Sequence, residues 1–122
     1  MQIIISDKSS APIYEQITKQ IKEGILNHAL APDEMLPSIR QLAKELQISV
    51  ITTKRAYEEL ENEGLIYSVP QKGFFVSPCK VEILREKRLK LIEDTAAQLI
   101  KEGKAAGLSL DEVQTMIELL WA

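Results

Sequence analysis

With 122 residues, the chain is long enough for one ordinary domain, or for one small domain with a short appendage, and its 45% apolar and 27% charged residues exclude a disordered polypeptide. No apolar run approaches the roughly 18 to 20 residues that a bilayer requires, and the amino terminus lacks the features of a signal peptide, so we expect a cytoplasmic protein with no membrane contact. The net charge of −3 argues mildly against a nucleic-acid partner, but the placement of the cations decides more than their sum.

The first predicted elements are a short strand and a helix. Residues 3–5 form an apolar run ahead of a polar stretch, which predicts a short strand followed by a loop. An apolar side chain then recurs every four residues, at Ile13, Ile17, Ile21 and Ile25. This spacing places an apolar stripe along one face of a helix, and Pro12 suits its first turn. We therefore expect the first helix over about residues 12–28.

A second helix is predicted after a connection that holds two prolines. Pro32 and Pro37 cannot continue a helix and indicate a tight connection. Ser38 and Gln41 have the spacing of a capping box, in which each side chain satisfies a free backbone N–H at the start of a helix. The apolar pattern that follows predicts the second helix over about residues 39–46.

A third helix is predicted after a link of only three residues. Ser49 is a suitable N-cap, and Gly64 suits the left-handed residue that follows a helix end. The expected buried face consists of Thr53, Ala56, Tyr57 and Leu60. The first turns carry cations and no acid, whereas four glutamates occupy the later turns. This polarity suits a helix whose first turns enter the major groove of DNA.

The pattern then changes from helices to a β-hairpin. The expected strands span residues 65–69 and 74–77, and the turn between them has a basic tip at Lys72. Aromatic side chains in the hairpin leave stacking on single-stranded bases as an alternative. Three helices followed by a hairpin define a winged helix-turn-helix, so the fold class is mostly α with a small β-hairpin (α+β). We expect this domain to cover residues 1–78, with Pro78 at its end.

Residues 79–122 are predicted to form a two-helix tail. A long helix ends at Gly107, and a short one begins with a second capping box formed by Ser109 and Glu112. The two apolar faces exceed what two helices can bury against each other, so we expect a homodimer interface, with a foreign helix or a small apolar ligand as the alternative occupant. The expected dimerisation residues are Ile92, Ala96, Leu99, Gly103, Ala106, Val113, Met116, Ile117 and Leu120.

The sequence offers little for catalysis or metal binding. Cys79 and His28 are the only residues of their kinds, so neither an internal disulfide nor a cluster of metal ligands can be assembled from them. We interpret His28 as a residue near a helix end and Cys79 as inert, with redox sensing as its alternative. No catalytic set and no phosphate-binding glycine loop occurs, so we expect no enzyme, no cofactor and no metal.

The resemblance to a known family rests on several spaced stretches. Residues 36–43, 48–60, 63–66 and 72–76 resemble the DNA-binding signature of GntR-family regulators, and residues 12–17 fit the start of that domain. A two-helix tail in place of a large effector domain makes the chain similar to the YtrA-type branch. This resemblance implies an autoregulating repressor of a transporter-type operon that binds double-stranded operator DNA as a homodimer, with a small-molecule effector left unassigned.

The resemblance also implies individual contacts. Arg40 would contact the DNA backbone and nearby bases, and Thr52 would bind phosphate. Lys54 would contact the major groove, with Arg55 as the alternative base-reading residue because family members usually carry Arg where this chain has Lys54. The expected DNA-binding residues are Ser38, Arg40, Ser49, Val50, Ile51, Thr52, Lys54, Arg55, Lys72 and Gly73. The alternative function is a winged-helix adaptor without DNA binding, which would need acidic or apolar residues on the leading face of the third helix.

Overall fold

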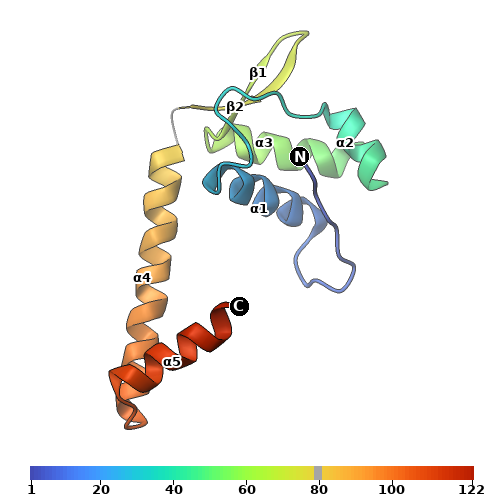
Figure 1. Cartoon of the computed structure of the whole chain (residues 1–122). Helices are drawn as coiled ribbons and strands as arrows, with labels where there is room; N and C mark the ends of the chain where they lie inside the picture. The colour runs from blue at the N-terminus through green and yellow to red at the C-terminus, as the bar shows by residue number, and fades with distance from the viewer. Residues whose placement is uncertain (79–80) are drawn as a thin grey trace. The chain divides into compact units, whose positions relative to one another are not determined.

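The structure is a computed structural model that describes residues 1–78 and 81–122 (Figure 1). The described residues form five helices and two strands: α1 (Ile13–Leu26), α2 (Ile39–Leu46), α3 (Val50–Asn62), β1 (Ile66–Val69), β2 (Gly73–Val76), α4 (Val81–Ala105) and α5 (Leu110–Trp121). This confirms the predicted fold class, mostly α with a small hairpin. The chain divides into two compact units, Met1–Leu84 and Arg85–Ala122, which we call the head and the tail.

Helix α1 supplies one side of the head core. Ile17, Ile21 and Ile25 are almost fully buried, as the four-residue spacing predicts. The helix packs along α3, and the two lie side by side in Figure 1. It ends two residues earlier than expected, because Asn27 caps it and His28 adopts a left-handed conformation with φ of 64°.

Helices α2 and α3 begin at the predicted serine N-caps. The Ser49 hydroxyl accepts the N–H of Thr52 at 3.0 Å, and the four residues of the expected inner face of α3 are all buried. The Ser38 hydroxyl accepts the N–H of Gln41 at 3.1 Å. The second contact of that predicted capping box, from the Gln41 side chain back to the Ser38 backbone, is wrong. The Gln41 side chain donates instead to Glu45, one turn further along the same helix.

The loop between α1 and α2 is hydrogen-bonded to the hairpin and forms one isolated antiparallel bridge with it, between Met35 and Phe75. Strands β1 and β2 pair in antiparallel register, with Ile66 opposite Val76. On the other edge of β2, the N–H of Asp33 donates to the carbonyl of Val76 at 2.7 Å, and the N–H of Leu36 donates to that of Phe74 at 2.9 Å. The loop that holds the two prolines is therefore hydrogen-bonded to the hairpin.

The expected strand over residues 3–5 is wrong, although the segment does pack on the core. Ile3 is buried, but the backbone of Ile4 pairs with a side chain and not with a strand. The Gln20 amide accepts the N–H of Ile4 at 2.9 Å and donates to its carbonyl at 2.7 Å. Gln16 makes the same two-way contact with Ser6. These glutamines satisfy the backbone polar groups that a neighbouring strand would otherwise satisfy.

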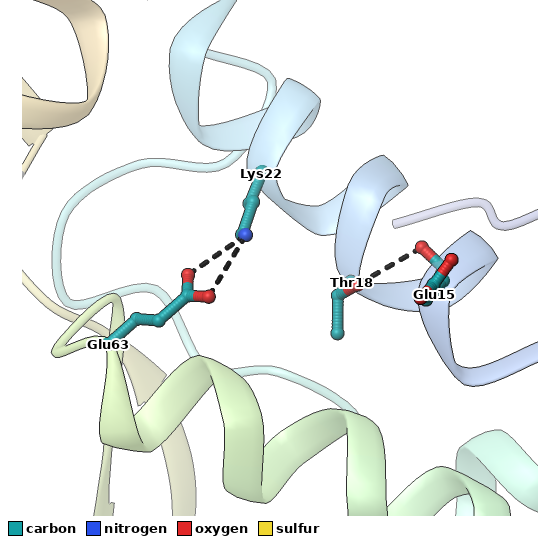
Figure 2. Close-up of polar contacts among 4 residues, drawn as sticks. All are labelled: Glu15, Thr18, Lys22 and Glu63. Atoms are coloured by element: carbon teal, nitrogen blue, oxygen red, sulfur yellow. Dashed lines mark hydrogen bonds and ion pairs between the residues drawn. The ribbon is translucent and has the colours of Figure 1, made fainter. Parts of the chain in front are cut away.

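An ion pair connects α1 to the residue that ends α3. Figure 2 shows that the Lys22 ammonium contacts both carboxylate oxygens of Glu63, with Nζ 2.9 Å from Oε2 and 3.2 Å from Oε1. One turn earlier, the Thr18 hydroxyl donates to the backbone carbonyl of Glu15 at 3.0 Å, so it makes a local contact within α1. The Lys22 contact joins the two helices across their packed faces.

In the tail, α5 packs on α4 at a glycine. Gly103 is buried, and a Cβ atom added there would lie only 3.2 Å from the Val113 side chain. Gly107, with φ of 78°, ends α4, and the capping box of Ser109 and Glu112 is present as predicted. Exposed apolar side chains follow both helices, namely Leu89, Leu91, Ile92, Ile100, Leu110, Met116, Ile117, Leu119, Leu120 and Trp121. Within residues 1–78 and 81–122, no helix is both long and apolar enough to cross a membrane.

Candidate nucleic-acid interface

The start of α3 is a capped helix end that presents two cations. The Ser49 hydroxyl donates to the Thr52 hydroxyl at 2.8 Å, which fixes both side chains beside the first backbone N–H groups. The first turn, every residue of which the structure describes, contains no acidic residue. Because the dipole of a helix favours anions at its N-terminus, this end suits a phosphate group.

The outer face of α3 carries the side chains that could reach a ligand. Ile51 is 81% exposed, and the side chains of Lys54 and Arg55 are 62% and 60% exposed. Consecutive helical residues are about 100° apart, so Lys54 and Arg55 point to different sides of this face. The face therefore offers an apolar side chain between two cations.

Each of the four glutamates on the later turns of α3 has a partner. Glu58 and Glu59 lie 3.7 Å from Lys54 and Arg55, respectively. Glu61 accepts the Ser68 hydroxyl of β1 at 2.8 Å, and Glu63 pairs with Lys22 of α1. Two of the acids are thus used to join α3 to its neighbours. The other two lie one turn behind the exposed cations and moderate their charge.

Helix α2 and the hairpin carry the remaining residues that were predicted to bind DNA. Ser38 and Arg40 are exposed at the start of α2. At the hairpin tip, Lys72 is exposed and Gly73 has φ of 124°, a value that L side chains rarely adopt. The ten residues predicted to bind DNA therefore all lie in the head, at the starts of two helices and at the hairpin tip.

The hairpin aromatics pack mainly within the protein. Phe74 meets the ring of Tyr57 edge-on, with centroids 5.0 Å apart. Tyr67 and Phe75 stack on each other at 5.5 Å. The Tyr67 hydroxyl donates to Asp33 at 2.7 Å, and this hydrogen bond raises the pKa of Tyr67. Because these rings contact each other and neighbouring elements, the hairpin lacks an open row of rings of the kind that stacks on single-stranded bases.

The sequence did not reveal the contact between Tyr14 and Arg55. Tyr14 is half-buried against the head core, and the Arg55 guanidinium carbon lies 3.8 Å from the centroid of its ring. The two residues are far apart in the sequence. No spacing rule connects the edge of one helix with the exposed face of another, so only the fold could show this pair.

The residues predicted for dimerisation lie in the tail and differ in what they contact. Gly103 and Val113 pack against each other within the chain. Leu99 is half-buried, and the others, Ile92, Ala96, Ala106, Met116, Ile117 and Leu120, are exposed. Cys79 lies outside the described residues, and the prediction for it stays a prediction. The described residues hold no group of three or more His, Cys, Asp or Glu side chains placed to bind a metal ion.

A capped helix with exposed cations, joined by a short link to a second helix and followed by a hairpin with a basic tip, is a winged helix-turn-helix. This fold, together with the cations that it exposes, defines the class of DNA-binding transcription regulators. The family model described as "Bacterial regulatory proteins, gntR family" matches residues 13–76. The chain therefore belongs to the GntR family of bacterial regulatory proteins, which confirms the resemblance found in the sequence.

Individual relatives agree with this assignment. The chain is 36% identical to the HTH-type transcriptional repressor YtrA of Bacillus subtilis, over 95% of this chain and 89% of the relative. Its structure is similar to that of a GntR family transcriptional regulator from Listeria monocytogenes, with a TM-score of 0.73 and 28% identity over 93% and 97% of the two chains. It is also similar to the DNA-binding domain of AraR in complex with operator ORX1, with a TM-score of 0.56 and 28% identity over 63% and 96%.

Proposed function

We propose that the chain is a homodimeric repressor that inserts α3 into the major groove of a two-fold operator. One observation carries the proposal: the first turns of α3 combine a capped helix start with the exposed side chains of Ile51, Lys54 and Arg55. A helix fits the major groove, and its first residues then face the base edges. The AraR domain, a structural relative, was solved with an operator, which supports DNA as the partner.

The proposed contacts follow from the chemistry of each group. Ser49, Thr52 and the adjacent N–H groups suit phosphate oxygens, and the exposed Arg40 on α2 adds a further cation for the DNA backbone. Lys54 suits the acceptors of guanine. Ile51, an exposed apolar side chain, suits the methyl group of thymine. Lys72 and Gly73 at the hairpin tip suit the backbone and the floor of the minor groove.

Homodimerisation is proposed to occur through the tail. Many large apolar side chains of α4 and α5 are exposed, including Trp121 at 86%, and exposed apolar surface of this extent is typical of an interaction site. A second copy of the tail supplies a matching surface, because an isologous interface is self-complementary. The resulting two-fold symmetry would present two copies of α3 to two half-sites.

The proposed regulatory role is repression by occlusion of the operator. A dimer that covers an operator excludes polymerase, and a relative of similar length is named a repressor. We propose that the protein acts in the cytoplasm on a transporter-type operon that includes its own gene. The resemblance to YtrA-type regulators is the support for this last step, and no small-molecule effector is assigned.

A protein adaptor is the second candidate, because Val50 and Ile51 are exposed apolar residues on the leading turn of α3.

DNA binding is tested by selecting duplexes from a random pool with the full chain, and then measuring affinity for the selected duplex and for a scrambled one. With six to ten phosphate contacts, affinity should fall on the order of a thousandfold or more between 50 and 200 mM salt. No enrichment, with affinity flat across that range, would reject DNA binding and favour the adaptor.

A further inference from the structure

Arg55 is held by two neighbours in the head. Its guanidinium carbon lies 3.8 Å from the centroid of the Tyr14 ring, on α1. Its Nε lies 3.7 Å from a carboxylate oxygen of Glu59, one turn later on α3. A guanidinium over an aromatic face is attracted by the negative charge of that face, and the contact restricts the side chain to few rotamers. Arg55 is therefore preorganised beside α1 before any ligand binds.

Lys54 is held much less firmly. The only ion pair recorded for it within the described residues joins it to Glu58 at 3.7 Å, and both side chains are about 60% exposed. Exposed pairs of this kind, four residues apart on one helix, are weak because water screens them. The Lys54 side chain can leave such a partner and extend toward a ligand at little cost.

The two cations also point to different sides of α3. Residues seven apart share a helix face, so Lys54 lies in line with Glu61, which contacts Ser68 of the hairpin. Arg55 lies in line with Glu59 and, one turn further, with Glu63, which contacts α1. Lys54 thus belongs to the hairpin side of the helix, and Arg55 to the α1 side.

We propose that Arg55 binds a phosphate of the DNA backbone and not a base, and that Tyr14 is the positioning residue that holds it there. The proposal rests on the proposed DNA-binding function. One face of the guanidinium lies against the Tyr14 ring. Its N–H donors lie in the guanidinium plane and stay available for the oxygens of one phosphate. A side chain held against α1 does not extend to the floor of the groove. Base recognition by a cation of α3 is thereby left to Lys54.

The first experiment compares Arg55→Met with Lys54→Met in the full chain, using the selected and the scrambled duplex. Arg55→Met should weaken binding to both duplexes by the same factor, about five- to twentyfold, and should reduce the salt slope by about 1 per half-site. Lys54→Met should lose affinity mainly for the selected duplex. A selective loss in Arg55→Met, with scrambled binding unchanged, would overturn the proposal while leaving DNA binding intact.

The second experiment isolates the positioning role of Tyr14. Tyr14→Leu should weaken binding to both duplexes about three- to tenfold, and Tyr14→Phe, which keeps the ring, should bind like the wild type. In an Arg55→Met background, Tyr14→Leu should cause no further loss, because there is no guanidinium left to position. A loss of equal size in that background would show that Tyr14 acts through the fold or contacts DNA itself, and would overturn its positioning role.

A measurement on the wild type does not depend on any variant folding. In the ¹⁵N-labelled full chain, the Arg55 Nε–H signal should move by a similar amount when either duplex is added, because both carry the same phosphates. A signal that responds only to the selected duplex would identify Arg55 as a base-reading residue. If neither duplex binds the wild type at all, the proposed function fails, and this result is distinct from all the others.

Discussion

The hydroxyl of Tyr57, in the middle of α3, donates a 2.6 Å hydrogen bond to the backbone carbonyl of Pro37, just before α2. The side chain is fully buried, and its ring meets Phe74 of the hairpin edge-on. One side chain therefore joins α3 to the start of α2 and to the hairpin. These are the three elements that carry the proposed DNA contacts, so Tyr57 fixes their relative placement within the head.

Tyr57→Phe should destabilise the head by about 1 to 3 kcal/mol, because the Pro37 carbonyl would lose its buried donor while the ring packing stays. The measurement is urea denaturation of the full chain. Tyr67→Phe is the matched control, since its hydroxyl bond to Asp33 is exposed and its loss should have a much smaller effect on stability. Equal losses in the two variants would mean that the Pro37 bond has no special role.

Stability should also fall at alkaline pH through Tyr57. Burial, and then the charge of Glu45, raise the pKa of Tyr57 above its ordinary value of 10.0. Above about pH 10 the unfolded chain loses this proton while the folded chain keeps it. The unfolded state then gains about 1.4 kcal/mol per pH unit. Tyr57→Phe should lose stability less steeply than the wild type when melting is followed from pH 9 to 11. Parallel curves would contradict this.

The helices of the head could be predicted because their signals are local. The four-residue spacing of isoleucines in α1 and the serine caps Ser38 and Ser49 depend only on near neighbours in the sequence. The predicted strand over residues 3–5 failed for a physical reason. An apolar run shows that a segment is buried, but not whether its backbone meets a strand or, as here, the side chain of Gln20.

The sequence proposes residues for the candidate site, but it does not show how they contact one another. Lys54 and Arg55 are adjacent and both basic, so the sequence could not tell which one contacts bases. The fold separates the two cations, because it places Tyr14 against Arg55, and our proposal for their different roles rests on this contact. The hydrogen bond between Leu36 and Phe74 was equally hidden, because two prolines nearby argued for a loop and not for an extended partner of β2.

Lys54→Ala and Arg40→Ala should differ in the kind of binding they lose. If Lys54 contacts a base, its loss should cost about 1 to 3 kcal/mol and relax the preference at one operator position. If Arg40 on α2 acts through its phosphate contact, its loss should weaken binding to all sequences alike. Both side chains are exposed, and both variants should stay folded. Selection from a random pool with each variant distinguishes the two, and an unaltered consensus from Lys54→Ala would contradict the assignment.

Lys22→Met should have little effect on stability although its ion pair is short. Glu63 is about half exposed, and pairs in contact with water contribute roughly 0 to 1 kcal/mol. Ile21→Ala, at the preceding position of α1, should cost about 2 to 5 kcal/mol, because it opens a cavity in a fully buried site. Thermal unfolding of the two variants gives the comparison. A larger loss from Lys22→Met would mean that the pair, and not the core, holds α1 on α3.

Truncation after Leu84 should leave a folded monomer that binds DNA far more weakly. Leu84 packs against the head core. A head truncated after Pro78 lacks this contact, so it serves as the matched variant and should be less stable than the head truncated after Leu84. Without the tail, two heads lose the effective concentration that linkage supplies. Light scattering and titration with the selected duplex test both points. A full chain that is monomeric, or a head that dimerises alone, would move the interface away from the tail.

The hydrogen bonds between residues 33–36 and β2 also constrain how the protein is made. Residues 33–36 leave the ribosome well before β2, which supplies the carbonyls of Phe74 and Val76 that they bind. Local helices form within microseconds, whereas a pairing between distant segments must wait for both partners. The head can therefore complete its core only after synthesis has passed β2 and Leu84. Until that moment the nascent chain exposes an unpaired edge, and the tail leaves the ribosome after the head.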